Sequence, residues 1–120
     1  MWKGKWKNQY GSIVDITDET DNHVTGTFTT ALDDSGFYGQ TIPVLGICQG
    51  ECISFVCGGV TPAGDAVVSY TGLLRDGKME TLWFVAADSA VKAKVGEQGK
   101  VEKLKFWRSI TTSADTFERV

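Results

Sequence analysis

The sequence predicts an all-β protein, an eight-stranded antiparallel up-and-down β-barrel with an extended loop or an extra hairpin before the last strand. Short runs rich in Val, Thr, Ile and aromatic residues recur along the whole chain, which holds 14 Gly and 2 Pro. Turn residues separate these runs, and no long crossover connects them. Closing such a meander into a barrel removes its edge strands, and eight strands enclose room for about one small ligand.

The first predicted strand covers residues 3–10 and shows the alternation of a strand with two different faces. Trp6, Asn8 and Tyr10 fall on one face, which Ser12 extends, and the lysines between them fall on the other. A period of two is typical of a half-buried strand. We therefore expect Trp6 to fill the closed end of the barrel and the polar residues after it to face the interior.

The other strands follow in order, separated by turn signals. The run 12–17 fits either a second strand or an extension of the first. The further predicted runs are 24–32, 39–45, 52–57, 66–74, 78–87 and 111–119. The segment 18–22 is read as a polar turn. Asp76-Gly77 is a strong signal for a two-residue hairpin turn.

Residues 88–105 fit two structures. Val91, Ala93 and Val95 alternate with lysines, and Gly96 to Gly99 resembles a turn. An extra hairpin accounts for this pattern, and so does a short helix that ends at Gly96. Short apolar patterns separate the two poorly, and the hairpin is favoured here.

Length and charge limit the classes of function. The chain has 120 residues, a mass of 13.1 kDa and a net charge of −3, so we expect one domain over residues 1–120. No basic patch favours nucleic acid, and no apolar stretch is long enough to span a bilayer. Since no signal peptide precedes the first strand, we expect a cytoplasmic protein or a mature secreted form with an added Met.

The three cysteines, Cys48, Cys52 and Cys57, do not have zinc-ligand spacing, and His23 is the only histidine. We therefore predict no metal site. A three-residue hairpin loop would place Cys48 opposite Cys52, where a disulfide is allowed. Two free thiols are the alternative, and the sequence leaves both open.

Four segments carry a resemblance to a known family. They are Gly4 to Ser12, Thr25 to Leu32, Leu82 to Val85 after the predicted hairpin turn, and Trp107 to Val120. In this order, and in a chain of this length, they resemble the avidin and streptavidin family. The resemblance implies a barrel that holds biotin, with no cofactor.

The resemblance also implies a set of contacts to the cyclic urea of biotin. Asn8 and Ser12 match donors to the urea oxygen, and Phe28 stands where the family has a third donor, a Tyr. Thr30 and Asp115 match the acceptors for the two urea N–H groups. A carboxylate suits that position because charge-assisted hydrogen bonds are stronger than neutral ones.

The walls of the implied site are aromatic. Trp83 and Trp107 match ring-contacting tryptophans, Tyr70 stands where relatives carry Trp or Phe, and Cys57 stands where the family has a further Trp. In the family the residue matching Trp107 reaches the ligand of a neighbouring subunit, which implies a homo-dimer or homo-tetramer. The expected lining is completed by Tyr10, Leu32 and Val85.

Three functional hypotheses follow. The first is biotin binding, weaker than in relatives that carry the full motif. The second is a barrel of the same fold that has lost biotin and holds a different small ligand. The third is an enzyme that uses Asp115 as acid or base, which we disfavour because the chain has no Ser-His-Asp order and no metal-ligand spacing. None of the three involves nucleic acid or a membrane.

Overall fold

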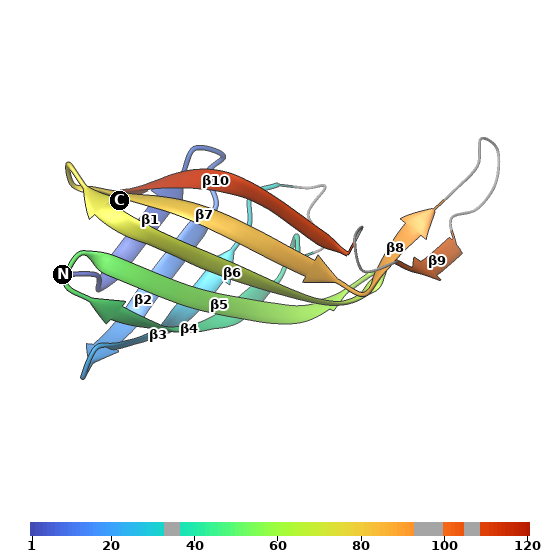
Figure 1. The fold of residues 1–120 in the computed structure, drawn as a ribbon, viewed down its shortest axis with the longest axis horizontal. Coiled ribbons are helices and arrows are strands. Elements are labelled where there is room, and N and C mark those ends of the chain that lie inside the picture. The colour runs from blue at the N-terminus through green and yellow to red at the C-terminus, as the bar shows by residue number, and fades with distance from the viewer. Residues whose placement is uncertain (33–36, 93–99, 105–108) are drawn as a thin grey trace.

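The computed structural model describes residues 1–32, 37–92, 100–104 and 109–120. It is a closed antiparallel barrel in which β1 pairs with β2 on one side and with β10 on the other (Figure 1). This confirms the predicted eight-stranded up-and-down barrel. Its strands are β1 (Gly4–Asn8), β2 (Ile13–Thr20), β3 (His23–Thr29), β4 (Thr41–Gln49), β5 (Cys52–Thr61), β6 (Gly64–Arg75), β7 (Lys78–Ala87) and β10 (Ile110–Arg119).

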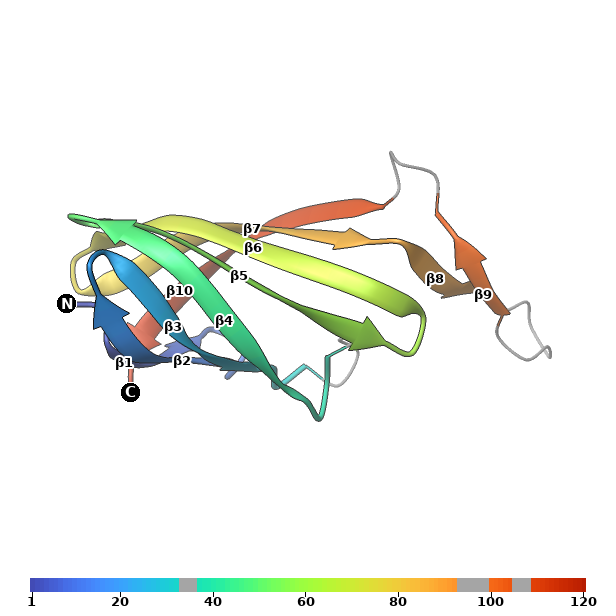
Figure 2. The same cartoon turned by 90° about the horizontal axis from the view of Figure 1, so that it is seen from below.

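A separate two-stranded sheet extends from one end of the barrel, away from the two chain termini (Figures 1 and 2). It consists of β8 (Ser89–Lys92) and β9 (Lys100–Lys103), which pair in antiparallel register from Ser89↔Lys103 to Lys92↔Lys100. Strand pairing here confirms the extra hairpin over the alternative of a helix. Residues 93–99, which connect the two strands, lie outside the described part of the chain.

The hairpin turn predicted at Asp76-Gly77 is confirmed. Arg75 pairs with Lys78 across it, and both central residues have positive φ, 52° for Asp76 and 75° for Gly77. Two consecutive central residues with positive φ are typical of the type I′ turn, whose twist matches that of the flanking strands.

The polar turn predicted for residues 18–22 is too long. β2 continues to Thr20, which pairs with His23, so that only Asp21 and Asn22 form the turn. The carboxylate of Glu19 accepts hydrogen bonds from backbone N–H groups near the N-terminus, including that of Trp2 at 2.8 Å. Glu19 therefore stabilises a strand within this polar stretch, because the folded barrel brings the N-terminal backbone N–H groups close to its carboxylate.

The predicted three-residue loop between Cys48 and Cys52 is wrong. Gln49 pairs with Cys52 and Cys48 pairs with Ile53, which leaves a two-residue turn. Cys48 is buried inside the barrel and Cys52 is exposed on its outside. All three cysteines are free thiols, because neighbouring residues of a hairpin that point to opposite faces do not meet the geometry of a disulfide.

Buried aromatic residues fill the barrel end nearer the termini, as expected for Trp6. Trp2 and Trp6 are almost fully buried with ring centroids 6.1 Å apart, and the Trp6 indole N–H donates to the Trp2 carbonyl at 2.8 Å. The guanidinium of Arg119 lies over the Trp6 ring, 4.2 Å from its centroid, and adds a cation–π contact. Buried aromatic side chains therefore close this end of the barrel.

Within the described ranges, no helix is long and apolar enough to cross a bilayer.

Gly46 and Gly72 allow neighbouring strands to approach closely on the inner face of the barrel. A Cβ at Gly46 would lie 2.6 Å from the Cα of Phe55, and one at Gly72 would lie 2.8 Å from the Cγ2 of Thr81. These contacts are too short for any side chain, so the curvature of the sheet depends on glycine at both positions.

We expect Gly46→Ala to lower the free energy of unfolding by about 1–3 kcal/mol, because the added methyl forces β4 and β5 apart. Gly59→Ala in β5 is the matched control, since its Cβ would meet nothing closer than 3.4 Å. We expect it to change the free energy of unfolding by less than about 1 kcal/mol. Chemical denaturation measures both variants, and equal losses would contradict the close-approach explanation.

Candidate functional site

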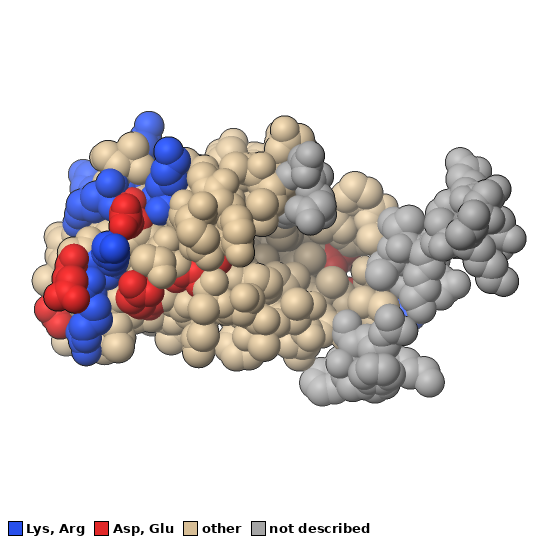
Figure 3. All heavy atoms as spheres, turned by 90° about the horizontal axis from the view of Figure 1, so that it is seen from above, with Lys and Arg blue, Asp and Glu red and all other residues tan. Residues whose placement is uncertain are grey.

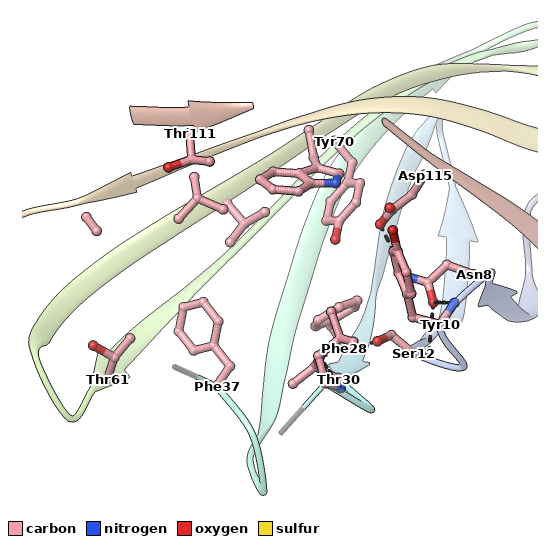
Figure 4. A pocket seen from close by; sticks show the side chains of 15 residues that line it. Asn8, Tyr10, Ser12, Phe28, Thr30, Phe37, Thr61, Tyr70, Thr111 and Asp115 are labelled. Carbon is pink, nitrogen blue, oxygen red and sulfur yellow. Dashed lines mark hydrogen bonds between the residues drawn. The ribbon is translucent and has the colours of Figure 1, made fainter. Parts of the chain in front are cut away.

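A cavity of about 540 Å³ lies inside the barrel, within the range of small-molecule sites. Asn8, Ser12, Thr30 and Asp115 gather at one end of it, and mostly apolar side chains line the rest (Figure 4). We call these four residues the polar end. All four are buried. The full lining is Asn8, Tyr10, Ser12, Phe28, Thr30, Leu32, Phe37, Thr61, Val68, Tyr70, Trp83, Val85, Ala87, Thr111 and Asp115.

The Asn8 side chain is held in one orientation at the end of β1. Its Oδ1 accepts the backbone N–H groups of Tyr10 at 3.1 Å and Ser12 at 2.9 Å, and its Nδ2 donates to Oδ2 of Asp115 at 3.1 Å. Both acceptor positions of the amide oxygen are thereby occupied. An amide nitrogen carries two hydrogens, so one remains for a ligand acceptor.

Ser12 and Thr30 form a hydroxyl pair with Oγ and Oγ1 3.2 Å apart. Ser12 Oγ also accepts the N–H of Ala31 at 2.9 Å, and Thr30 Oγ1 accepts that of Leu32 at 3.2 Å. If Thr30 donates to Ser12, the Ser12 oxygen is saturated as an acceptor and its hydrogen is available to a ligand. In that state Thr30 keeps one lone pair to accept a ligand N–H.

Asp115 in β10 is anchored through both its backbone and its carboxylate. Its carbonyl accepts the Thr81 hydroxyl of β7 at 2.9 Å, and its Oδ1 accepts the Gln9 amide at 3.0 Å. With Asn8 on Oδ2, the carboxylate has partners on both oxygens. The position of the carboxylate is therefore fixed before any ligand arrives.

Gln9 is a site residue that the sequence did not reveal. It follows the inward Asn8, so alternation places it on the outer face of the strand with the lysines. Its side chain instead reaches the neighbouring β10, where Oε1 accepts the backbone N–H of Thr116 at 3.0 Å and Nε2 donates to Asp115. No sequence signal marks this role, because it depends on β1 and β10 being neighbours.

Aromatic side chains form the wall beside the polar end. Phe28 and Tyr70 lie with ring centroids 6.1 Å apart, and Tyr70 pairs across the ladder with Trp83, which is partly buried. Burial, together with the neighbouring Asp115 carboxylate, raises the pKa of Tyr70 well above its ordinary value. Its phenol therefore stays neutral at physiological pH and keeps a hydrogen to donate.

Ten of the twelve residues predicted for the site line the cavity. Tyr10 and Leu32 do so while remaining exposed. Cys57 is buried in the core but is not among the lining residues, and burial raises the pKa of its thiol to about 12. Trp107 lies outside the residues that the structure describes. The ten are Asn8, Tyr10, Ser12, Phe28, Thr30, Leu32, Tyr70, Trp83, Val85 and Asp115.

Further lining residues follow from alternation alone. Val68 stands two residues before Tyr70, Ala87 two after Val85, and all of them face inward. Phe37 is different, because it comes from the connection between β3 and β4 and packs near Gly59 of β5. No periodic pattern marks a loop residue of this kind. The lining residues outside the twelve predicted for the site are Phe37, Thr61, Val68, Ala87 and Thr111.

The arrangement suits a neutral planar group that presents one acceptor flanked by two N–H donors. Asn8 and Ser12 offer hydrogens at the polar end, and Thr30 and Asp115 offer acceptors there. A ligand without this pattern would leave buried polar groups unpaired, at a cost of about 1–3 kcal/mol for each group. The polar end is therefore built to select a cyclic urea or a related amide.

Comparisons with known proteins give a consistent result. A model described as the Avidin family matches residues 1–120. Similar solved structures include a shwanavidin variant in complex with biotin (20% identity, TM-score 0.75, 100% of this chain and 98% of that one) and a rhizavidin–biotin complex (21% identity, TM-score 0.72, 100% and 92%). Core-bradavidin is 27% identical, with a TM-score of 0.73 and 97% of each chain covered. No curated protein sequence matches the chain.

The burial of the thiols leads to a test of the packing around the cavity. Cys48 and Cys57 are buried, and burial raises the pKa of both thiols. At pH 8 we expect no more than one thiol of the folded protein, that of Cys52, to react with an aromatic disulfide reagent within minutes, and all three to react in denaturant. Cys52→Ser should abolish the reaction of the folded protein. Continued reaction of that folded variant would contradict the packing described here.

Proposed function

Because the chain belongs to the avidin family, we propose that it binds biotin inside the barrel, as a binding protein and not as an enzyme. The observation that carries this proposal is the pattern of remaining hydrogen-bond capacity at the polar end. One hydrogen each from Asn8 and Ser12 is available for the urea oxygen. Thr30 and Asp115 each have acceptor capacity for a urea N–H.

The apolar part of the cavity suits the rest of the ligand. Val68, Trp83 and Val85 are among its lining residues, and Phe37 lies farther from Asn8 and Asp115 than Phe28 does (Figure 4). A fused ring and an alkyl tail gain free energy here by leaving water. Exclusion of water also strengthens the polar contacts beside them.

We further propose that the affinity is lower than in relatives that carry the full family motif. Cys57 replaces an indole in the resemblance and does not line the cavity, while Val68 offers only carbon to the ligand. Each missing contact leaves apolar ligand surface less well covered. This lowers the binding free energy gained by about 25 cal/mol for each Å² of ligand surface that stays exposed to water.

The outside of the barrel supports association of this chain with itself. Large apolar side chains are exposed on neighbouring strands from β4 to β10, a surface that we call the outer apolar face. Its members are Leu45, Ile47, Val56, Val67, Leu73, Leu82, Phe84 and Ile110. Lys and Arg gather at the end with the termini, while most of the rest of the face in Figure 3 carries no charge.

Contiguous exposed apolar surface is rare on monomeric proteins and typical of obligate interfaces. A second copy of the chain presents the same apolar face, so the two surfaces are complementary without any other partner. We therefore propose a homo-dimer or homo-tetramer that covers the outer apolar face.

Calorimetric titration with biotin, with the thiols reduced, tests the ligand. We expect saturable binding with one site per chain, and we expect Asp115→Asn to weaken it about tenfold to 150-fold, because a hydrogen bond to a charged group contributes about 1.5–3 kcal/mol. Glu118→Gln removes an exposed carboxylate from the same strand and should leave the affinity unchanged.

An unaltered protein that shows no heat with biotin would refute biotin as the ligand. The second hypothesis, a different small ligand with a related cyclic amide, would then be tested by screening in the same format.

Phe84→Asp tests the proposed association. A carboxylate in the centre of the outer apolar face should shift the protein toward monomer in sedimentation velocity at micromolar concentration, because an unpaired buried charge is costly. Thr25→Asp places the same charge on the exposed face of β3 and should leave the mass unchanged. Monomeric unaltered protein would contradict the proposal.

A further inference from the structure

Tyr70 holds its hydroxyl in a fixed place inside the cavity. Its ring is almost fully buried and is contacted on three sides: stacked on Phe55 with centroids 4.9 Å apart, edge-on to Phe117 at 5.6 Å and tilted against Phe28 at 6.1 Å. Rings packed in this way do not shift without disturbing the core. Only the hydroxyl hydrogen is free to turn about the C–O bond.

The hydroxyl points into the cavity toward the polar end, on the side of Asp115 (Figure 4). Burial and the neighbouring Asp115 carboxylate raise the pKa of Tyr70, so the hydroxyl stays protonated and has a hydrogen to donate. In the empty cavity, the side-chain donors to the Asp115 carboxylate are Asn8 and Gln9.

A ligand N–H that binds Asp115 joins the donors from Asn8 and Gln9 on a carboxylate with about four acceptor positions. In a urea the oxygen and the N–H share one carbon, so the ligand oxygen then lies at the polar end as well. The Tyr70 hydroxyl needs an acceptor there. Asn8 Oδ1 already accepts two backbone N–H groups, and the ring of Phe28 has no acceptor, which leaves the oxygen of the ligand.

We infer that Tyr70 is a specificity-determining residue of the cavity: when ligand is bound, its hydroxyl donates a hydrogen bond to the oxygen of the head group. The inference rests on the proposed function, since it concerns the same ligand. With Asn8 and Ser12, Tyr70 offers three donors at the polar end of the cavity. Such a site accepts a carbonyl oxygen and rejects a group that carries hydrogen at that position.

The test compares biotin with 2-iminobiotin, whose guanidine carries an N–H in place of the urea oxygen. The dissociation constants of both ligands are measured at one neutral pH for four proteins: unaltered, Tyr70→Phe, Phe28→Tyr, and the double variant. We expect Tyr70→Phe to weaken biotin about tenfold and to weaken 2-iminobiotin less, so that the preference for biotin falls. If Tyr70 acted only through the packing of its ring, the ratio of the two dissociation constants would not change.

The double variant moves the hydroxyl to the ring in contact with position 70. We expect it to recover part of the preference for biotin that Tyr70→Phe loses. Phe28→Tyr alone is the reference for the double variant, because it carries the added hydroxyl beside an intact Tyr70. Tyr38→Phe makes the same chemical change at an exposed tyrosine outside the cavity and should leave both ligands unaffected.

The outcomes separate the inference from the proposed function. If the unaltered protein binds biotin and Tyr70→Phe keeps the same ratio of dissociation constants, the inference is overturned and biotin binding stands. If the unaltered protein binds neither ligand, the proposed function fails and the inference fails with it. Thermal unfolding of each variant checks that the fold is kept, and a Tyr70→Phe variant that is folded with a reduced ratio supports the inference.

Discussion

The hydrogen bond from Asn8 to Asp115 joins the first and last strands of the barrel, and both the fold and the candidate site depend on it. The backbone ladder between β1 and β10 covers three residue pairs and ends at Asn8. Beyond that point side chains continue the contact, because Asn8 binds the Asp115 carboxylate and Gln9 binds both that carboxylate and the β10 backbone. The acceptor that faces the cavity is thus also part of the closure of the barrel, which fixes its position before any ligand binds.

The side chains of the polar end are hydrogen-bonded in the empty cavity and still have the capacity to select a ligand. Among the residues that the structure describes, no buried side-chain nitrogen or oxygen lacks a hydrogen-bond partner. The empty cavity therefore carries no large penalty for burying Asn8, Ser12, Thr30 and Asp115. What remains is one hydrogen on each of Asn8 and Ser12 and acceptor capacity on Thr30 and Asp115. A ligand is selected by how well it matches these remaining positions, because a ligand that does not match them shields them from water without giving them a partner.

The run Leu82 to Val85 shows how one strand serves two surfaces. Trp83 and Val85 point inward and line the cavity, whereas Leu82 and Phe84 point outward and are exposed. A strand that is apolar on both faces is typical of one buried on both sides. In this barrel the inner face is buried by the fold itself, and the exposed outer face belongs to the surface for which we propose association with a second copy of the chain. Alternate residues of β7 therefore line the cavity and the proposed interface.

The sequence by itself determined the strands, the tight turn at Asp76-Gly77 and most of the inward residues, because these follow from a period of two and from backbone conformation within a few neighbours. Only the tertiary structure decided the rest. The faces on which Cys48 and Cys52 lie depend on the register of β4 against β5, and the role of Gln9 depends on β10 lying beside β1. The hydroxyl of Tyr70 comes near Asp115 only in the closed barrel. Such contacts join residues far apart in the chain, and alternation within one strand contains no information about which strand lies opposite.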